Sequence, residues 1–334
     1  MDYRFYNSTR VEHLVLLRFL AISSIPSSIE RFENLEFLFV DNSETAEIPE
    51  NLFNMVKLRR VYFSGGAQFS KSWRERAGEG KRFPISRLLR FSNVSINDDK
   101  DEKILKNSRN LQRLKCKFAV FFDSSENKYR YPVLNFLDKL ESLSIYFCRS
   151  YVIDDPSPDL TNLPLNLRRL TLSNFNLSWK QMEIIGKLPE LEVLKLRDGI
   201  IEEKRWDTKE GEFEKLKFLE LDEVQIGQWN ALNDHFPKLE RLVLRSCQHL
   251  EIPSDLGYCP YLLKIELHGC EESVELSASR IKEEQEDYRD DLEVIHLPLL
   301  ISVLSCLNYL ILNNLFGGLF SQHSDLTLCS VFIL

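Results

Sequence analysis

Two short segments near the C-terminus carry the residue types that bind zinc. Cys247 and His249 form a C-x-H pair, and His268 and Cys270 form an H-x-C pair further along the chain. Thiolate and imidazole groups are the usual ligands of a tetrahedral zinc site, and four of them complete one. Whether these four side chains could reach one ion depends on the structural elements that carry them.

Both pairs lie at the end of a recurring pattern of aliphatic residues. Leu239, Leu242, Leu244 and Cys247 follow the pattern L-x-x-L-x-L-x-x-N/C, which is typical of leucine-rich repeats. Four consecutive copies begin at residues 191, 216, 239 and 262, which are 25, 23 and 23 residues apart. In each copy a short strand would direct its aliphatic side chains into a continuous core and the alternate ones onto a shared surface. The sequence therefore predicts an α/β leucine-rich repeat solenoid (horseshoe), with a parallel concave β-sheet and a convex side of loops and short helices.

Within this repeat the two pairs cannot share a metal ion. We count positions in each repeat from its first leucine, which has offset 0. Cys247 and Cys270 occupy offset 8, where the side chain points into the core, and Cys148 occupies the same offset of an earlier copy. His268 occupies offset 6, on the outer face of its strand. Because ligands on opposite sides of a backbone cannot bind one ion, we predict buried structural cysteines and no metal site.

No other segment predicts catalysis. The run Gly78-Glu-Gly80-Lys81 departs from the phosphate loop G-x-x-x-x-G-K-S/T at both ends, where Glu75 and Arg82 stand. The nucleophile pattern G-x-S-x-G and the zinc-protease pattern H-E-x-x-H do not occur in the sequence. We therefore predict that the protein is not an enzyme and has no cofactor.

Charge and cysteine usage restrict the partners and the compartment. The formal net charge is -8, whereas a protein that binds nucleic acid needs a basic face, so we predict no nucleic-acid partner. The seven cysteines include no C-x-x-C pair, and the first ten residues contain no apolar stretch typical of a signal peptide. These features favour a reducing, cytoplasmic location.

The repeats also predict the domain organisation. A solenoid of about eleven repeats spans residues 1–270, with an irregular, basic insertion over 64–87. In the fourth repeat, either Leu88–Phe91 or Phe91–Val94–Ile96 could fill the core positions. The first repeat begins so close to Met1 that no N-terminal cap is visible, and we expect that further sequence preceded it in the parent architecture.

The C-terminal part differs in character from the repeats. Residues 271–296 are acidic and predict a helical cap followed by a last strand, with one helix face formed by Ala278, Ile281, Gln285 and Tyr288. Residues 297–334 form an apolar tail, of which 297–322 carry no charge. Three interpretations of this tail stay open: a final irregular repeat, a poorly packed non-native tail, or a membrane anchor. Membrane contact, or peripheral membrane association, is expected only through 297–322.

Side chains at offsets 4 and 6 of the repeats are predicted to line the concave face. The N-terminal half presents aromatic residues and lysines, and the C-terminal half presents alternating charges, with Lys195 facing Glu220 and with Asp222 between two arginines. Exposed aromatic residues beside cations are typical of protein-recognition surfaces. The candidate protein-binding residues are Phe39, Tyr62, Lys115, Lys117, Tyr146, Lys195, Arg197, Glu220, Asp222, Arg245 and His268.

One family has a similar order of segments. Residues 206–295 contain Glu212-Phe-Glu-Lys-Leu-Lys-Phe-Leu, then Asp234-His-Phe-Pro-Lys-Leu-Glu-Arg-Leu, then Ile252-Pro-Ser-Asp-Leu-Gly. This order resembles the C-terminal repeats of plant intracellular NLR immune receptors of the late-blight-resistance, coiled-coil type, and the similarity covers most of residues 10–297. The resemblance implies a domain that restrains a nucleotide-binding switch and takes part in sensing pathogen effectors. It also implies an upstream coiled coil and an NB-ARC ATPase, neither of which this sequence contains.

These observations give one main hypothesis and two alternatives. The main hypothesis is a protein-recognition or regulatory module of a plant disease-resistance protein, truncated relative to the full receptor. Its partners would be a pathogen effector, the NB-ARC domain of a related receptor, or a guarded host protein. The first alternative is the substrate-binding part of an F-box ubiquitin-ligase adaptor, and the second is an extracellular receptor ectodomain.

Overall fold

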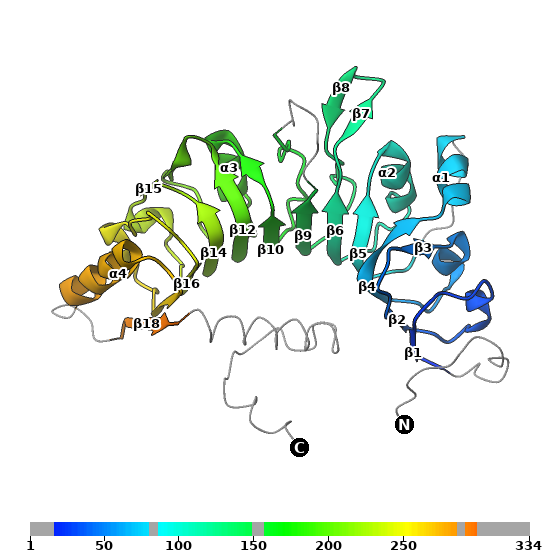
Figure 1. The fold of residues 1–334 in the computed structure, drawn as a ribbon, viewed down its shortest axis with the longest axis horizontal. Helices are drawn as coiled ribbons and strands as arrows, with labels where there is room; N and C mark the ends of the chain where they lie inside the picture. The colour runs from blue at the N-terminus through cyan, green and yellow to red at the C-terminus, as the bar shows by residue number, and fades with distance from the viewer. Residues whose placement is uncertain (1–16, 80–85, 149–156, 286–290, 299–334) are drawn as a thin grey trace. The chain divides into compact units, whose positions relative to one another are not determined.

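The computed structural model describes residues 17–79, 86–148, 157–285 and 291–298. The chain divides into two units, Met1–Leu297 and Pro298–Leu334, and every element named below lies in the first. Within that unit a long parallel sheet curves from β1 to β18, and helices α1, α2 and α3 lie on its outer side (Figure 1). We call the opposite side of the sheet the concave face.

The unit is built from short strands, with short helices between many of them. The strands are β1 (Phe19–Ile22), β2 (Phe37–Val40), β3 (Ala46–Ile48), β4 (Arg60–Phe69), β5 (Arg90–Ile96), β6 (Arg113–Phe118), β7 (Phe121–Asp123), β8 (Lys128–Arg130), β9 (Ser142–Phe147), β10 (Arg169–Ser173), β11 (Asn176–Leu177), β12 (Val193–Ile201), β13 (Arg205–Asp207), β14 (Phe218–Gln225), β15 (Gln228–Asn230), β16 (Arg241–Arg245), β17 (Lys264–His268) and β18 (Glu293–Leu297). The α-helices are α1 (Lys71–Gly78), α2 (Asp99–Leu105), α3 (Trp179–Gly186) and α4 (Glu272–Gln285). The 3-10 helices are η1 (Ile29–Arg31), η2 (Glu50–Asn54), η3 (Glu202–Lys204), η4 (Asn233–His235) and η5 (Ser254–Tyr258).

The sheet confirms the predicted solenoid and its register. Among the described residues it has 14 strands, in the order β1-β2-β4-β5-β6-β9-β10-β12-β14-β16-β17-β18, with β3 and β11 paired at its margin. Equivalent offsets of successive repeats pair directly, because Leu194 lies opposite Leu170 on one side and Leu219 on the other. A parallel sheet with this register stacks each aliphatic position on the next one.

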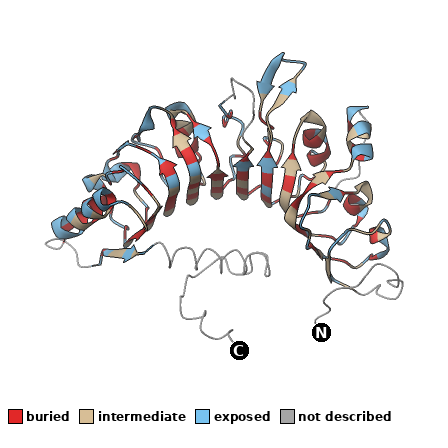
Figure 2. Cartoon of the chain, in the orientation of Figure 1, coloured by how far each residue is buried: buried red, intermediate tan, exposed pale blue. Residues whose placement is uncertain are grey.

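The stacked aliphatic positions form one core. Leu194, Leu219 and Leu242 are fully buried, whereas Lys115 and Tyr146, which stand at alternate positions of their strands, are exposed. Figure 2 shows this alternation as bands of buried and less buried residues across the central strands. The period of two places one set of side chains in the core and the other on the concave face.

A bulge resolves the two alternatives left open for the fourth repeat. Leu88, Phe91, Val94 and Ile96 are all buried. Phe91 pairs with Leu114 and Val94 pairs with Cys116, so β5 has one more residue than β6 between these pairs. The extra residue is Asn93, which has no register partner in β6 and has a φ of 63°. Both readings of the sequence were therefore partly right, because the bulge allows both sets of positions into the core.

The segment 64–87, expected to be an irregular insertion, contains regular elements over much of its length, although the pairing of β4 with β5 shifts in register between Tyr62 and Ala67. Strand β4 continues to Phe69, and α1 follows it directly. Phe69 and Trp73 are buried, and their rings contact each other edge-to-face at 5.1 Å. Phe69 and Trp73 attach the segment to the core. The many glycines and basic residues around them in the sequence made this role hard to predict.

The C-terminal part of the unit consists of α4 and β18. Ala278, Ile281 and Gln285 of the expected helix face are buried, and Tyr288 lies outside the described residues. Strand β18 pairs in parallel with β17. The tail interpretations for 297–334 fall almost entirely outside the described residues. Within the part of the chain that the structure describes, no helix combines the length and apolar character needed to cross a membrane.

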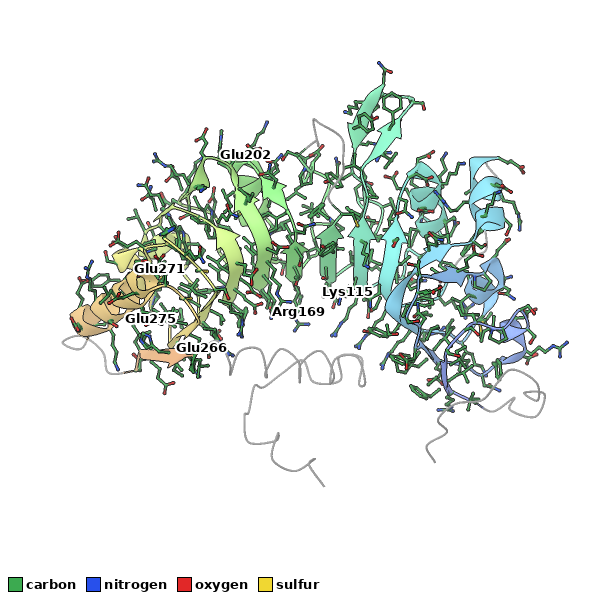
Figure 3. All side chains as sticks on the ribbon, in the orientation of Figure 1. Lys115, Arg169, Glu202, Glu266, Glu271 and Glu275 are labelled. Atoms are coloured by element: carbon green, nitrogen blue, oxygen red, sulfur yellow. The ribbon has the colours of Figure 1, made fainter. Side chains whose placement is uncertain are left out.

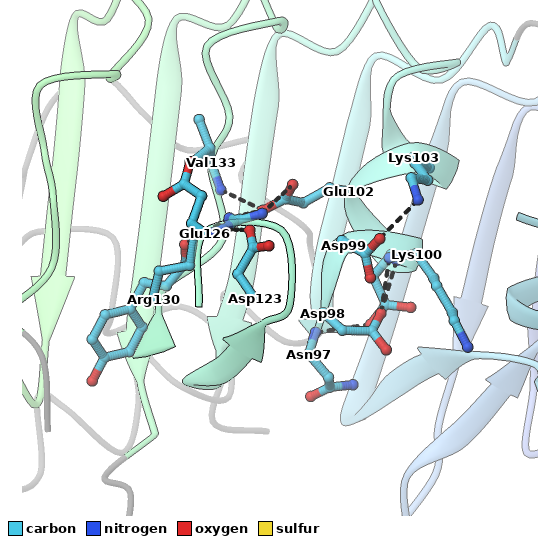
Figure 4. A network of polar contacts seen from close by, with 12 residues as sticks. Asn97, Asp98, Asp99, Lys100, Glu102, Lys103, Asp123, Glu126, Arg130 and Val133 are labelled. Carbon is cyan, nitrogen blue, oxygen red and sulfur yellow. Dashed lines mark hydrogen bonds and ion pairs between the residues drawn. The ribbon is translucent and has the colours of Figure 1, made fainter. Parts of the chain in front are cut away.

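A small hairpin projects from the solenoid and is attached by one arginine. Strands β7 and β8 pair antiparallel, and Arg130 at the end of β8 contacts two carboxylates. Its Nη1 lies 2.6 Å from Glu102 of α2, and its Nε lies 2.6 Å from Asp123 of β7 (Figure 4). Glu102 also accepts a hydrogen bond from the backbone N–H of Val133, at 2.9 Å. Arg130 therefore joins the hairpin to the preceding repeat.

We expect Gly65→Ala to lower the free energy of unfolding by about 2–3 kcal/mol, measured by urea denaturation. A Cβ at Gly65 would lie 2.3 Å from the carbonyl oxygen of Asn42, where β4 passes the end of the neighbouring repeat. Backbone cannot yield as a flexible side chain can. Gly78→Ala is the control, because its Cβ would meet only the Lys100 side chain, at 3.4 Å. Equal stability of Gly65→Ala and wild type would contradict this close approach.

Candidate protein-binding surface

The N-terminal end of the concave face carries a packed aromatic pair. Phe39 of β2 and Tyr62 of β4 are register partners, and their rings stack at 5.3 Å with an interplanar angle of 3°. Tyr62 is buried, and this burial raises the pKa of its hydroxyl although Asn93 hydrogen-bonds to it. The structure thus differs from the expected row of exposed aromatics here: Phe39 is half-buried and covers Tyr62.

Exposed lysines and a tyrosine lie on the next strands. Lys115 and Lys117 belong to β6, and Tyr146 of β9 is the register partner of Lys117. All three side chains are exposed, Tyr146 at 44%. Partial desolvation lowers the pKa of Lys115, and the positive charges of Arg197 and Lys117 lower it further. The structure brings these three residues together as the sequence predicted.

A row of arginines, which offsets 4 and 6 of the repeats do not include, continues this surface. Arg60, Arg90, Arg113 and Arg169 stand at offset 2 of their repeats, and Arg90 pairs with Arg60 on one side and Arg113 on the other. Offset 2 has the same parity as offsets 4 and 6, so these side chains share the concave face. Figure 3 shows Lys115 and Arg169 on this side of the sheet, away from the helices. Reading offset 2 in the same way would have found them.

Positive charge is concentrated at these residues, and the charge of Glu141 offsets part of it at Arg113. Burial and then the charges of Arg113 and Arg60 lower the pKa of Arg90, and burial and then Arg169 lower that of Arg113. No carboxylate among the described residues lies within 4 Å of any of the six cations that we call the cationic face. These are Arg60, Arg90, Arg113, Lys115, Lys117 and Arg169. An acidic protein therefore carries a compact basic surface.

The C-terminal half of the concave face is organised around two buried glutamates rather than around Asp222. The predicted register is present, since Glu220 pairs with Lys195 and Asp222 lies between Arg197 and Arg245. Lys195 and Arg197 nevertheless both bind Glu220. Lys195 Nζ lies 3.0 Å from its Oε2, and Arg197 Nε lies 2.8 Å from its Oε1. Glu220 is only 3% exposed, although the sequence predicted it among the protein-binding residues of the concave face.

The electrostatics follow from these contacts. Burial alone would raise the pKa of Glu220, but Lys195 and Arg197 outweigh it and lower the pKa to about 2. Asp222 has no lysine or arginine nitrogen within 4 Å in the described part of the chain, and burial raises its pKa. Arg197 binds Glu220 because this carboxylate accepts bonds from two cations at once.

A second buried glutamate, Glu266 of β17, joins β17 to β16. Arg241 Nη2 lies 2.8 Å and Lys264 Nζ 3.3 Å from Glu266, and His268 Nε2 lies 3.5 Å from the same carboxylate. Burial would raise the pKa of Glu266, but His268, Arg241 and Lys264 lower it to about 2. His268, predicted to lie at the surface, is buried. This end of the face is therefore a packed ionic layer.

Of the cysteines predicted to be buried, Cys247 is buried, whereas Cys148 and Cys270 are partly exposed. Cys247 Sγ lies 3.5 Å from the carbonyl oxygen of Leu221, and Cys270 Sγ lies 3.4 Å from that of Leu244, each in the strand of the preceding repeat. Asn174, close to the equivalent position of an earlier repeat, donates to the carbonyl of Phe147 at 2.6 Å. The end of each of these repeats thus satisfies a strand carbonyl of its neighbour, which is why a short donor is required there.

Sequence comparisons agree with this architecture. The family described as "Leucine-rich repeat region" matches residues 2–310. The chain belongs to this leucine-rich repeat family. It is 32% identical over 314 residues to the putative late blight resistance protein homolog R1B-16 of Solanum demissum. The matched region covers 87% of this chain and 23% of that protein. It is also 32% identical over 306 residues to the late blight resistance protein R1-A of the same species, with 87% and 22% covered.

The relatives confirm the resemblance to late-blight-resistance proteins and fix its extent. The chain spans less than a quarter of the length of these two relatives. Another putative late blight resistance protein homolog of the same species is 34% identical over 309 residues, with 85% of this chain and 38% of its own length covered. Among solved structures, an internalin of Listeria monocytogenes covers 85% of this chain and 83% of its own, at a TM-score of 0.47 and 15% identity.

Proposed function

We propose that this chain is the protein-recognition module of a plant disease-resistance protein and that its cationic face binds an acidic protein surface. The partner would be a pathogen effector, a guarded host protein, or the NB-ARC region of a related receptor. The proposal is supported by the names of the relatives, which are late blight resistance proteins, and by the repeat fold that the family has.

One observation carries the choice of the surface. The cationic face has no carboxylate within 4 Å among the described residues, whereas on the other half of the sheet Lys195, Arg197, Arg241 and Lys264 form ion pairs with buried Glu220 and Glu266. Like charges held together destabilise a fold, so a surface of this kind is explained most simply by a partner that supplies the opposite charge. Exposed Tyr146 beside Lys117 adds the aromatic contact area that protein interfaces favour.

The double substitution Lys115→Glu/Lys117→Glu is expected to weaken binding of an acidic partner by about tenfold or more. The assay is co-purification of the non-repeat part of a late blight resistance relative with this chain, over a range of salt concentrations. Recovery with the wild-type chain should fall as salt rises, because exposed charges are screened.

The matched control is Lys180→Glu/Lys238→Glu, which makes the same change of charge at two exposed lysines outside the concave face. It should leave recovery unchanged. Equal loss in both double variants would show a dependence on net charge only. Equal recovery with all three proteins, at every salt concentration, would rule out the cationic face as the binding surface for this partner.

A further inference from the structure

A groove on the outer side of the solenoid lies between a sheet edge and the last helix. It has a volume of about 610 Å³ and is lined by Gln228–Leu232, by Glu251–Asp255, and by Ser277, Arg280, Ile281 and Glu284 of α4. Ligand sites of proteins commonly have volumes of about 300–1,000 Å³. This groove is separate from the concave face.

The sheet edge in the groove is unpaired. Strands β13 and β15 form a two-stranded parallel sheet in which Trp229 is the register partner of Trp206. The backbone N–H of Thr208 donates to the carbonyl of Asn230 at 3.0 Å, so Asn230 faces β13. Because successive residues of a strand alternate in direction, the backbone N–H and carbonyl of Trp229 face away from β13, toward the groove. Among the described residues no partner for them is found beyond this edge.

The next repeat does not supply a third strand, for a local reason. Ile252 stands 23 residues after Trp229, one repeat further along. Its backbone N–H instead donates to Ser277 Oγ of α4, at 3.1 Å, and Pro253 has no N–H to donate. This N–H is therefore bonded to α4 and not to β15, and the groove lies between β15 and residues 251–255, where a third strand would stand.

Two further observations indicate what the groove could bind. The indole Nε1 of Trp229 is buried and has no hydrogen-bond partner in the described part of the chain, although the ring stacks on Trp206 at 5.0 Å. The polar lining is acidic: Glu251 lies 3.6 Å from Arg280, whereas Asp255 and Glu284 have no cation within 4 Å among the described residues. An unpaired edge beside uncompensated carboxylates suits an extended, basic peptide.

We propose that this groove binds an extended, lysine- or arginine-containing peptide segment of a partner protein, which adds a third strand to β13 and β15. Backbone hydrogen bonds to Trp229 would position the peptide, and Asp255 and Glu284 would select its basic side chains. At about 3.3 Å per residue, a strand of three to five residues fits an edge of this length. This site would serve a different partner segment from the cationic face.

The test measures fluorescence anisotropy of labelled five-residue peptides that alternate lysine or arginine with valine, using the full chain. We expect saturable binding, at least about tenfold weaker for Asp255→Asn/Glu284→Gln. The control Glu210→Gln/Glu214→Gln removes two exposed carboxylates outside the groove and should bind like wild type. Lys115→Glu/Lys117→Glu should also bind normally, which separates this site from the proposed function.

Backbone pairing is tested on the peptide, so that folding of the protein is not affected. The same peptides with every backbone amide N-methylated keep their charges but cannot donate to a strand edge, and we expect them to show no saturable binding. Equal binding of the methylated peptides would overturn strand addition. Equal binding by the groove variant and its control would overturn the site, as would failure of every peptide to bind.

Discussion

Replacing Glu220 by glutamine is expected to lower the free energy of unfolding by about 3 kcal/mol at pH 7. Glu220 is buried, and it neutralises Lys195 and Arg197 from a neighbouring strand. Its pKa of about 2, against an ordinary value of 4.5, measures how strongly the folded state prefers the charged form. Glutamine keeps the shape but leaves the two cations facing an uncharged group.

The pH dependence provides the sharper measurement. Because the folded-state pKa of Glu220 is lowered, its contribution is complete above pH 4.5 and is lost as the pH falls toward 2. The difference between wild type and Glu220→Gln should therefore be largest at neutral pH and should vanish near pH 2. Urea denaturation of both proteins at several pH values checks this. Glu266 titrates over the same range in both proteins, so the difference isolates Glu220.

Asp222→Asn is the matched control, two residues along the same strand. Burial raises the pKa of Asp222, so the folded state disfavours its charged form, and neutralising it should leave stability unchanged or slightly increase it at pH 7. If Asp222→Asn instead cost as much as Glu220→Gln, the ionic centre of this face would be Asp222, and the assignment to Glu220 would be wrong.

Removing the arginine that attaches the β7–β8 hairpin is the second change with a large expected effect. Arg130→Ala should lower the free energy of unfolding by about 3 kcal/mol, because it leaves buried Glu102 without its cation. Arg130 also lies over the ring of Phe121, at 4.5 Å, and this contact is lost too. Hydrogen exchange of β7 and β8 should rise well above that of the sheet strands.

Lys128→Ala tests whether the effect depends on position. Lys128 lies on the same strand, and its ion pair with Glu126 is exposed. Such pairs contribute little, so its unfolding midpoint should match wild type. Glu102→Gln should reproduce most of the loss seen in Arg130→Ala. A small effect of both Arg130→Ala and Glu102→Gln would mean that the hairpin is held by packing rather than by this ion pair.

The parts of the concave face that the sequence predicted well are those set by strand parity alone. Lys115, Lys117 and Tyr146 are exposed neighbours because alternation and register suffice to place them. The same reasoning failed for Glu220 and His268, which are buried. Parity specifies the face of a side chain, but its burial depends on the lengths and charges of the neighbours around it.

Local pattern determined the repeat, and long-range contacts determined its exceptions. The leucine spacing was sufficient to predict a parallel solenoid, since each aliphatic residue at a fixed offset meets its equivalent in the next strand. It could not reveal that β4 and α1 fill the apparent insertion, because Phe69 and Trp73 are identified as anchors only by the rings they contact.

The partners of each charged or polar group were decided only by the tertiary structure. Arg197 binds Glu220 rather than Asp222. Ser277 accepts the hydrogen bond from the backbone N–H of Ile252, and the edge of β15 therefore stays unpaired. Both outcomes depend on distances between residues about 25 positions apart in sequence. The register of the strands limits which partners are within reach, and side-chain packing decides which of these partners is bound. The sequence by itself determined which side chains share a face; the folded chain determined which of them are neutralised and which remain available to a partner.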